Sequence, residues 1–338
     1  MTCPTKNVAL AICSAVITTI FSLPVLAADA PVAARVTFDG NIRNNSLALS
    51  PDETTAVVSY SERPDVVVYD LKKSSVRGVL HGYTTPRNII FAPDGKTFYV
   101  SDSSLGEVVR IDSATLKVVS RLAAGPGAFG TALSKDGSAL YVNNQASSTV
   151  TRFDTQQNQA RAVISGFAQP RQGVRLSPDG SKLYVTNFLG DKVTIVDTQT
   201  DKVEGEITGF NKIRAISVTA DGKTMFAANS GTNNIAVVDI ARREILSTIT
   251  VGKDPYGAAL SPDGQFVYSG NLADNTVSVI EVATLKVVAT ISGFKQPRQA
   301  IVFTRDGTQA YVLNEDLSVS RVSRASQKIV DTLSAPRT

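Results

Sequence analysis

One pattern of hydrophobic and polar positions recurs along most of the chain. Each copy has an apolar stretch, a tight turn, a second apolar stretch that ends in a polar residue, a loop, and two further alternating stretches joined by a short turn. Apolar and β-branched residues alternating with polar ones over a few positions are typical of half-buried strands. The pattern therefore predicts an all-β chain with four short strands in each copy.

The tight turn between the first two strands sets the period of the repeat. It reads Ser-Pro-Asp-Gly or a variant of it, and its aspartates are separated by 42, 42, 43, 42, 42 and 43 residues, at Asp52, Asp94, Asp136, Asp179, Asp221, Asp263 and Asp306. Four strands in about 42 residues is the period of a propeller blade. We therefore expect a seven-bladed β-propeller of four-stranded antiparallel blades over residues 29–338, with the aspartates as turn residues.

The second strand of the fourth repeat reads Tyr184-Val185-Thr186-Asn187 and follows a Ser-Pro-Asp-Gly turn. With this motif at a fixed distance from the turn, the sequence resembles the YVTN family of β-propeller repeat proteins over essentially the whole mature chain. The resemblance implies the propeller fold. It transfers little function, because the family contains binding and surface proteins beside relatives that resemble lactonases.

The start of the chain has the pattern of an export signal. Lys6 precedes an apolar stretch from Val8 to Leu23, and small residues follow it, so that cleavage is expected after Ala27 or Ala28. The alternative, a retained membrane anchor, is disfavoured because threonine, serine and proline interrupt the apolar run. Residues 1–28 are therefore predicted to be a signal peptide, and the mature protein to be periplasmic or secreted.

Two terminal segments compete to close the predicted ring. Lys328–Leu333 has the character of the outermost strand of the last blade, and Val32–Phe38 has the same character. One of them is expected to complete the seventh blade, and the other to extend its edge or cross the rim. Either arrangement protects an edge that would otherwise invite aggregation.

Composition removes several kinds of chemistry. The chain has two cysteines, Cys3 and Cys13, both in the leader, one histidine, His81, and no tryptophan. Zinc sites of the usual kind need three or four Cys and His ligands, and quinone or d1-haem cofactors would lack their usual stacking residues and axial ligand. The sequence therefore predicts no metal, no cofactor and no catalytic residue, and the formal net charge of +4 is too small to favour nucleic acid.

Arginines recur where the chain enters the innermost strand of a blade. The loops between the outermost strand of one blade and the innermost strand of the next lie on the face opposite the Asp-Gly turns, at the mouth of the central channel. Four of them place an arginine four residues after an aromatic residue, the first has an arginine nearby, and the other two have an aromatic residue instead. The predicted ligand-binding residues are thus Arg43, Arg87, Phe129, Arg171, Arg214, Tyr256 and Arg298.

Two interpretations of these arginines stay open. In the first they are repeat residues that stack on aromatic rings or pair with carboxylates such as Asp102 or Glu315. In the second their mutual repulsion favours an anion, and the planar guanidinium suits a carboxylate or phosphate. The second predicts a binding protein whose partner is a small anion or an acidic protein segment.

The alternative function is a lactonase- or lyase-like enzyme at the same mouth, in which loop carboxylates, His81 and a divalent metal would act. Two other repeated positions are expected to be structural. The asparagines that end the second strands are expected to satisfy their own turns, and the tyrosines of these strands to pack between blades. The asparagines are Asn143, Asn187, Asn229, Asn271 and Asn314, and the tyrosines are Tyr99, Tyr141, Tyr184, Tyr268 and Tyr311.

Overall fold

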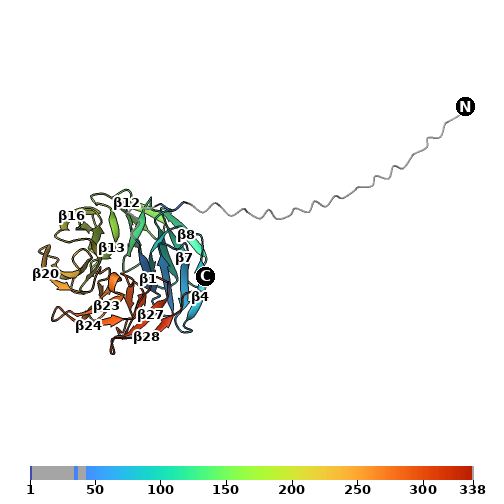
Figure 1. Ribbon diagram of the computed structural model, residues 1–338. Coiled ribbons are helices and arrows are strands. Elements are labelled where there is room, and N and C mark those ends of the chain that lie inside the picture. Colours follow the sequence, from blue (N-terminus) through green and yellow to red (C-terminus); the bar gives the residue numbers. More distant parts are fainter. Residues whose placement is uncertain (2–33, 37–42, 337–338) are drawn as a thin grey trace. The chain divides into compact units, whose positions relative to one another are not determined.

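The computed structural model describes Met1, residues 34–36 and residues 43–336. The chain divides into Met1–Val32 and Ala33–Thr338, and the fold belongs to the second unit. In this unit the described strands form seven four-stranded antiparallel sheets set around one axis (Figure 1), so the predicted seven-bladed β-propeller is confirmed. The predicted signal peptide lies, apart from Met1, outside the described residues.

Each blade has four strands, called here innermost, second, third and outermost. The innermost strands are β1 (Asn45–Leu49), β5 (Pro86–Phe91), β9 (Ala128–Leu133), β13 (Pro170–Leu176), β17 (Ile213–Val218), β21 (Ala259–Leu260) and β25 (Ile301–Phe303). The second strands are β2 (Thr55–Tyr60), β6 (Thr97–Asp102), β10 (Ala139–Asn144), β14 (Lys182–Asn187), β18 (Thr224–Asn229), β22 (Phe266–Asn271) and β26 (Gln309–Leu313). The third strands are β3 (Val66–Asp70), β7 (Glu107–Asp112), β11 (Thr149–Asp154), β15 (Val193–Asp197), β19 (Asn234–Asp239), β23 (Thr276–Glu281) and β27 (Val319–Ser323). The outermost strands are β4 (Ser75–Leu80), β8 (Val118–Ala123), β12 (Gln159–Ile164), β16 (Lys202–Ile207), β20 (Glu244–Thr250), β24 (Lys286–Ser292) and β28 (Lys328–Leu333). One short 3-10 helix, η1 (Leu272–Asp274), lies in the sixth blade.

Every blade is built from four consecutive strands, and β28 completes the seventh. Of the competing segment Val32–Phe38, residues 34–36 are described and form no strand. Arg35 pairs with Glu62, and the backbone N–H of Val36 donates to the Ser104 hydroxyl at 2.9 Å. These three residues therefore cross the rim over the loops of the first and second blades.

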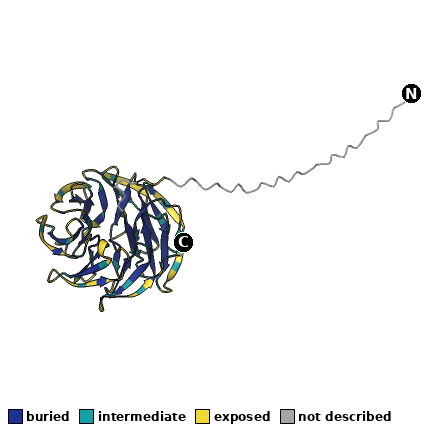
Figure 2. Ribbon diagram, viewed as in Figure 1, coloured by how far each residue is buried: buried dark blue, intermediate teal, exposed yellow. Residues whose placement is uncertain are grey.

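The apolar core is divided among the contacts between neighbouring blades. Seven clusters of buried residues are present, one at each blade interface. The second strands are almost entirely buried, whereas the outermost strands are mostly exposed or partly exposed (Figure 2). The five predicted tyrosines are all buried in these clusters, which confirms their packing role.

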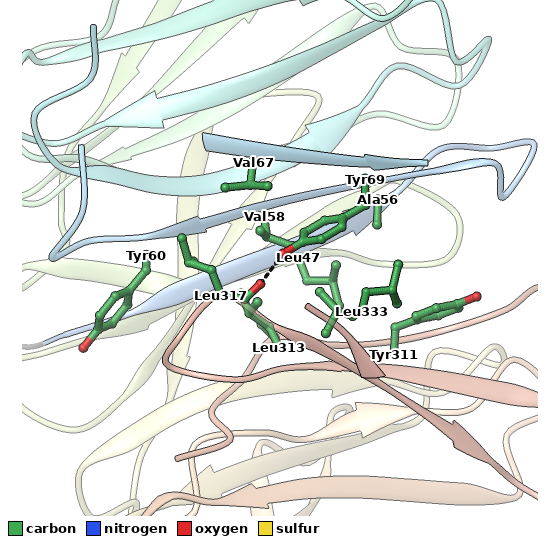
Figure 3. Packing of buried hydrophobic residues seen from close by; sticks show 12 residues of the cluster. Leu47, Ala56, Val58, Tyr60, Val67, Tyr69, Tyr311, Leu313, Leu317 and Leu333 are labelled. Carbon is green, nitrogen blue, oxygen red and sulfur yellow. Dashed lines mark hydrogen bonds between the residues drawn. The ribbon is translucent and has the colours of Figure 1, made fainter. Parts of the chain in front are cut away.

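The interface between the last and the first blade closes the ring without exchanging a strand. Twelve buried residues form its cluster (Figure 3), six from the first blade and six from the seventh. Within it the Tyr69 hydroxyl of β3 donates to the backbone carbonyl of Leu317 at 2.6 Å. Side-chain packing and hydrogen bonds such as this one hold the two blades together.

The aspartates of the tight turns bind within their own turns, as predicted. In the first blade the Ser50 hydroxyl donates to Asp52 at 2.6 Å and accepts the N–H of Thr55 at 3.0 Å. A serine or threonine two residues before the aspartate repeats this arrangement in six blades. The second blade has Ala92 there and lacks it.

Candidate functional site

Four of the five predicted arginines, all except Arg43, stack on an aromatic ring. The guanidinium carbon of Arg87 lies 4.6 Å from the ring centre of Phe129. That of Arg171 lies 4.0 Å from Phe188, which comes from the loop after β14. Guanidinium groups bind the faces of aromatic rings by electrostatic attraction, so stacking accounts for part of this arrangement.

Tyr256 receives two of these arginines. The guanidinium carbons of Arg214 and Arg298 lie 4.5 and 5.1 Å from its ring centre. Arg214 also donates through Nε to the Ser230 hydroxyl at 2.9 Å, and Arg298 donates through Nη1 to the carbonyl of Arg43 at 3.0 Å. Among the described residues, no carboxylate forms an ion pair with either arginine.

The aromatic residues of the arginine loops have a different role. They are buried in the clusters between blades rather than at the mouth, and they are Tyr83, Phe167, Phe210 and Phe294. The rings that contact the arginines come instead from Phe129, Phe188 and Tyr256. Phe188 was not among the predicted residues, because it belongs to a loop between the second and third strands.

Arg43 lies on the rim, away from the channel lining. About half of its side chain is exposed, and it pairs with Glu315 at 3.4 Å. The same carboxylate accepts the Tyr60 hydroxyl at 2.9 Å, and burial together with Glu315 raises the pKa of Tyr60 to about 12. Arg43 therefore belongs to a rim cluster with Tyr60 and Glu315. This arrangement agrees with the interpretation in which the arginines pair with carboxylates.

The channel contains a cavity of about 160 Å³ lined by the innermost strands. Its wall includes Phe129, Arg171, Arg214 and Tyr256 of the predicted residues, while Arg43, Arg87 and Arg298 lie outside it. None of the described residues in this wall carries a carboxylate. The lining is therefore cationic.

Four side-chain amides meet across the channel and form what we call the amide layer: Asn44, Asn88, Gln172 and Gln299. The carbonyl oxygen of Gln172 accepts from Asn44 at 2.9 Å and from Gln299 at 2.6 Å. Its amide nitrogen donates to the carbonyl of Asn45 at 3.2 Å and to the side-chain oxygen of Asn88 at 3.3 Å. Gln172 thus joins the fourth blade to the first, second and seventh, and its hydrogen-bonding capacity is filled.

Arg175 in β13 is a third arginine of the cavity wall, beside Arg171 and Arg214, and it was not among the predicted residues. It lines the cavity, and its Nη1 donates to the carbonyl of Val174 at 2.8 Å. The residue is exposed to the space of the channel. The protein atoms around the guanidinium displace water from it, and this desolvation lowers its pKa. Arginine nevertheless stays charged in proteins.

The asparagines that end the second strands are structural. In the fourth blade the Asn187 oxygen accepts the N–H of Ala168 at 2.8 Å, and its amide donates to the Thr194 hydroxyl at 3.0 Å. Asn314, Asn271 and Asn229 bind locally in related ways. In the third blade Asn144 has this place, because Asn143 instead donates to the carbonyl of Arg171 in the next blade.

An acidic residue replaces the asparagine in the second blade. Asp102 accepts the backbone N–H groups of Thr84 and Thr85 at 2.7 and 3.0 Å. Its carboxylate therefore holds the loop that leads to Arg87. Backbone N–H groups of this loop donate to it, as they donate to the asparagine oxygens of other blades.

Two family models match this chain. The model described as "Lactonase, 7-bladed beta-propeller" matches residues 43–208, and the "Cytochrome D1 heme domain" model matches residues 179–315. The solved structure of Kuenenia stuttgartiensis hydrazine synthase is similar, with 25% sequence identity, a TM-score of 0.64, and coverage of 70% of this chain and 76% of that chain. No curated protein matches significantly. These findings agree with the propeller fold, and the resemblance to YVTN proteins stays a prediction.

The name of the second model raises the question of a haem. Proteins hold haem iron through His, Cys, Met or Tyr. His81 is exposed on the outer part of its loop and contacts Asp65 at 2.7 Å, away from the cavity wall. Tyr256 is the one such donor among the described wall residues, and two guanidinium groups stack on its ring. The described channel residues therefore do not fit a haem.

Two further properties bear on the site. Among residues 34–36 and 43–336, no three His, Cys, Asp or Glu side chains are grouped so that they could hold a metal. The same part of the chain forms no helix with the length and apolarity needed to span a membrane.

Proposed function

We propose that this protein is an exported β-propeller that binds a small anion, or an acidic side chain of a protein segment, at the mouth of its central channel. The observation that carries the proposal is the pair of arginines on Tyr256. Arg214 Nη1 and Arg298 Nε are buried without a hydrogen-bond partner among the described residues. Buried donors of this kind are costly unless something binds them.

Electrostatics favours an anion at this place. Both guanidinium carbons lie close to one ring, so they are no more than about 10 Å apart. Two unit charges at that distance repel by about 1.5 kcal/mol or more at an effective dielectric constant near 20. A bound anion reduces this repulsion, and a carboxylate or phosphate has planar or tetrahedral oxygens that match a guanidinium.

The size of the cavity supports a small ligand. A volume of about 160 Å³ is below the range typical of pockets for drug-sized molecules. The amide layer crosses the channel beside the cavity, which limits how far a bulky group could enter. A small carboxylate, a phosphate or a single acidic side chain fits these limits.

Thermal unfolding with and without phosphate tests the proposal. A ligand at 100 times its Kd stabilises the folded state by about 2.7 kcal/mol, so phosphate should raise the Tm of the wild type. The double variant Arg214→Gln/Arg298→Gln should lose this response. Arg242→Gln, an exposed arginine on the opposite face, changes the charge in the same sense and should keep it. A phosphate response that survives in the double variant would contradict the proposal.

The match to the lactonase model supports a second candidate, a lactonase- or lyase-like enzyme at the same mouth. Its test is a hydrolysis assay with a panel of lactones, with and without divalent cations. His81→Asn is the informative variant, because His81 is the general base that this candidate would use. Absence of turnover in the wild type would contradict this candidate. Equal turnover in the wild type and the variant would show that His81 is not the general base.

Export rests on the leader pattern of residues 1–28. Expression of the full chain in a bacterial host should yield a mature protein that begins at residue 28 or 29 in the periplasmic fraction or the medium. N-terminal sequencing of that protein checks this expectation.

A further inference from the structure

Arg175 departs from the repeat at a position where every other blade has a small or aliphatic residue. Counting back four residues from each turn aspartate gives Ala48, Ile90, Ala132, Arg175, Ser217, Ala259 and Val302. A residue inherited with the repeat would recur, as the mouth arginines do in four blades. Arg175 therefore needs an explanation of its own.

The wall of the cavity that Arg175 lines combines apolar and polar side chains. The cavity wall includes the side chains of Leu47, Ile90 and Val302 from three other blades. Of the five N–H donors of its guanidinium, one bonds to a described acceptor, the carbonyl of Val174. The group is exposed to the cavity and thus brings a charge and unused donors to a space without a carboxylate among its described wall residues.

The neighbouring polar side chains do not need a ligand. Gln172 makes four hydrogen bonds, and Asn88 accepts from Ser46 at 3.2 Å and donates to Thr131 at 2.7 Å. Because the amide layer is satisfied internally, the anion-binding groups of the wall are the guanidiniums of Arg171, Arg175 and Arg214, and Arg175 is the one that shares its repeat position with Ile90 and Val302. A ligand that fits it has a single carboxylate and an otherwise apolar body.

We infer that Arg175 forms an interior site for short aliphatic monocarboxylates, with the carboxylate on the guanidinium and the hydrocarbon chain against Ile90 and Val302. This inference rests on the proposed function, because Arg175 lines the same cavity as Arg214 and Tyr256. It differs from that function in the residue that binds and in the ligand class. The mouth favours anions rich in oxygen, and the interior site favours an anion with a hydrocarbon tail.

Isothermal titration with acetate, propionate, butyrate and phosphate tests the inference. Each methylene buried from water should tighten binding about fourfold, so affinity should rise from acetate to butyrate. Arg175→Gln should weaken butyrate binding at least tenfold, and it should weaken butyrate binding more than phosphate binding. Arg175→Lys keeps the charge but loses the planar fork, and should fall between the two. Because other blades hold uncharged residues at this position, both variants should fold, and thermal unfolding checks that they do.

The outcomes separate this inference from the proposed function. Butyrate that binds Arg175→Gln as tightly as the wild type overturns the interior site. Wild-type protein that binds phosphate but shows no increase from acetate to butyrate also overturns it, and leaves the proposed function standing. If neither phosphate nor any carboxylate binds the wild type, both are wrong. Butyrate binding that Arg175→Gln removes and Arg214→Gln/Arg298→Gln retains supports Arg175 as the binding group.

Discussion

The hydroxyl of Tyr69 in the first blade donates to the backbone carbonyl of Leu317 in the seventh, 2.6 Å away. Both residues are buried, and burial raises the pKa of Tyr69, so the hydroxyl is protonated and donates at neutral pH. Tyr69→Phe should lower the free energy of unfolding by about 1–2 kcal/mol, because it leaves the Leu317 carbonyl buried without its partner. Urea unfolding at neutral pH measures the difference.

Tyr268→Phe is the matched control. Tyr268 is also fully buried at a blade interface, but its hydroxyl has no hydrogen-bond partner among the described residues. Removing it should leave stability unchanged or increase it. Equal destabilisation by the two substitutions would mean that the bond to Leu317 contributes nothing beyond packing.

The second blade lacks a turn interaction that six other blades have. Ala92→Ser should supply it, with a hydroxyl that donates to Asp94 and accepts the N–H of Thr97, as Ser50 does in the first blade. The expected gain is about 1 kcal/mol in the free energy of unfolding. Ser134→Ala makes the reverse change in the third blade and should cost a similar amount. Opposite signs in urea unfolding support the role given to this hydroxyl, and a loss of stability in Ala92→Ser would refute it.

The turn aspartates should make stability depend on acid. Hydrogen bonds from Ser134 and Ser138 lower the pKa of Asp136 to about 2, and those from Ser177 and Ser181 do the same for Asp179. An unfolded aspartate titrates near 3.9. Because the folded pKa is the lower one, these groups contribute stability that is complete above about pH 4 and is lost as the pH falls toward 2.

Urea midpoints between pH 2 and pH 5 check this expectation. In Asp136→Asn/Asp179→Asn the urea midpoint should depend less on pH over that range than in the wild type. At pH 5 and above the midpoint should depend only weakly on pH in both proteins. The effect is modest because both side chains are solvent-exposed. A double variant with the wild-type slope between pH 2 and pH 4 would show that other groups govern acid unfolding.

The ring of Tyr256 should matter to anion binding through its face rather than its hydroxyl. Tyr256→Phe keeps the ring on which the two arginines stack and should bind phosphate like the wild type. Tyr256→Leu removes the cation-π contacts with Arg214 and Arg298 and should weaken phosphate binding by about threefold to tenfold. Titration calorimetry distinguishes the two variants, and equal affinities would show that the ring does not hold the arginines in place.

The fold could be predicted because its information is local. Alternation over a few residues defines each strand, the Ser-Pro-Asp-Gly turn joins the first pair, and the period of about 42 residues gives the number of blades. The place of Phe129 and Tyr256 at the mouth followed from the same repeat. The sequence did not show which terminal segment completes the seventh blade, because β28 and the segment before β1 have similar composition.

The amide layer could not be predicted because its contacts cross the ring. Gln172 and Asn44 are 128 residues apart and belong to blades that are not neighbours. A signal did exist: the fourth and seventh repeats have the two spacings of 43, and the extra residue lies in the Pro-Arg-Gln entry to the innermost strand, where Gln172 and Gln299 stand. Arg175 becomes visible when the repeats are aligned backward from the turn aspartates, since no other blade has a charge there.

Each sheet of this propeller is made from one continuous stretch of chain, and no described strand is shared between the two ends of the ring. Duplication of a single genetic segment can therefore add a whole blade without dividing a sheet. Under such growth the blades begin identical, and a function confined to the channel can arise by altering one copy while the others keep the ring intact. Arg175, which is the single arginine at its position in the seven repeats, is the kind of change that this history would produce.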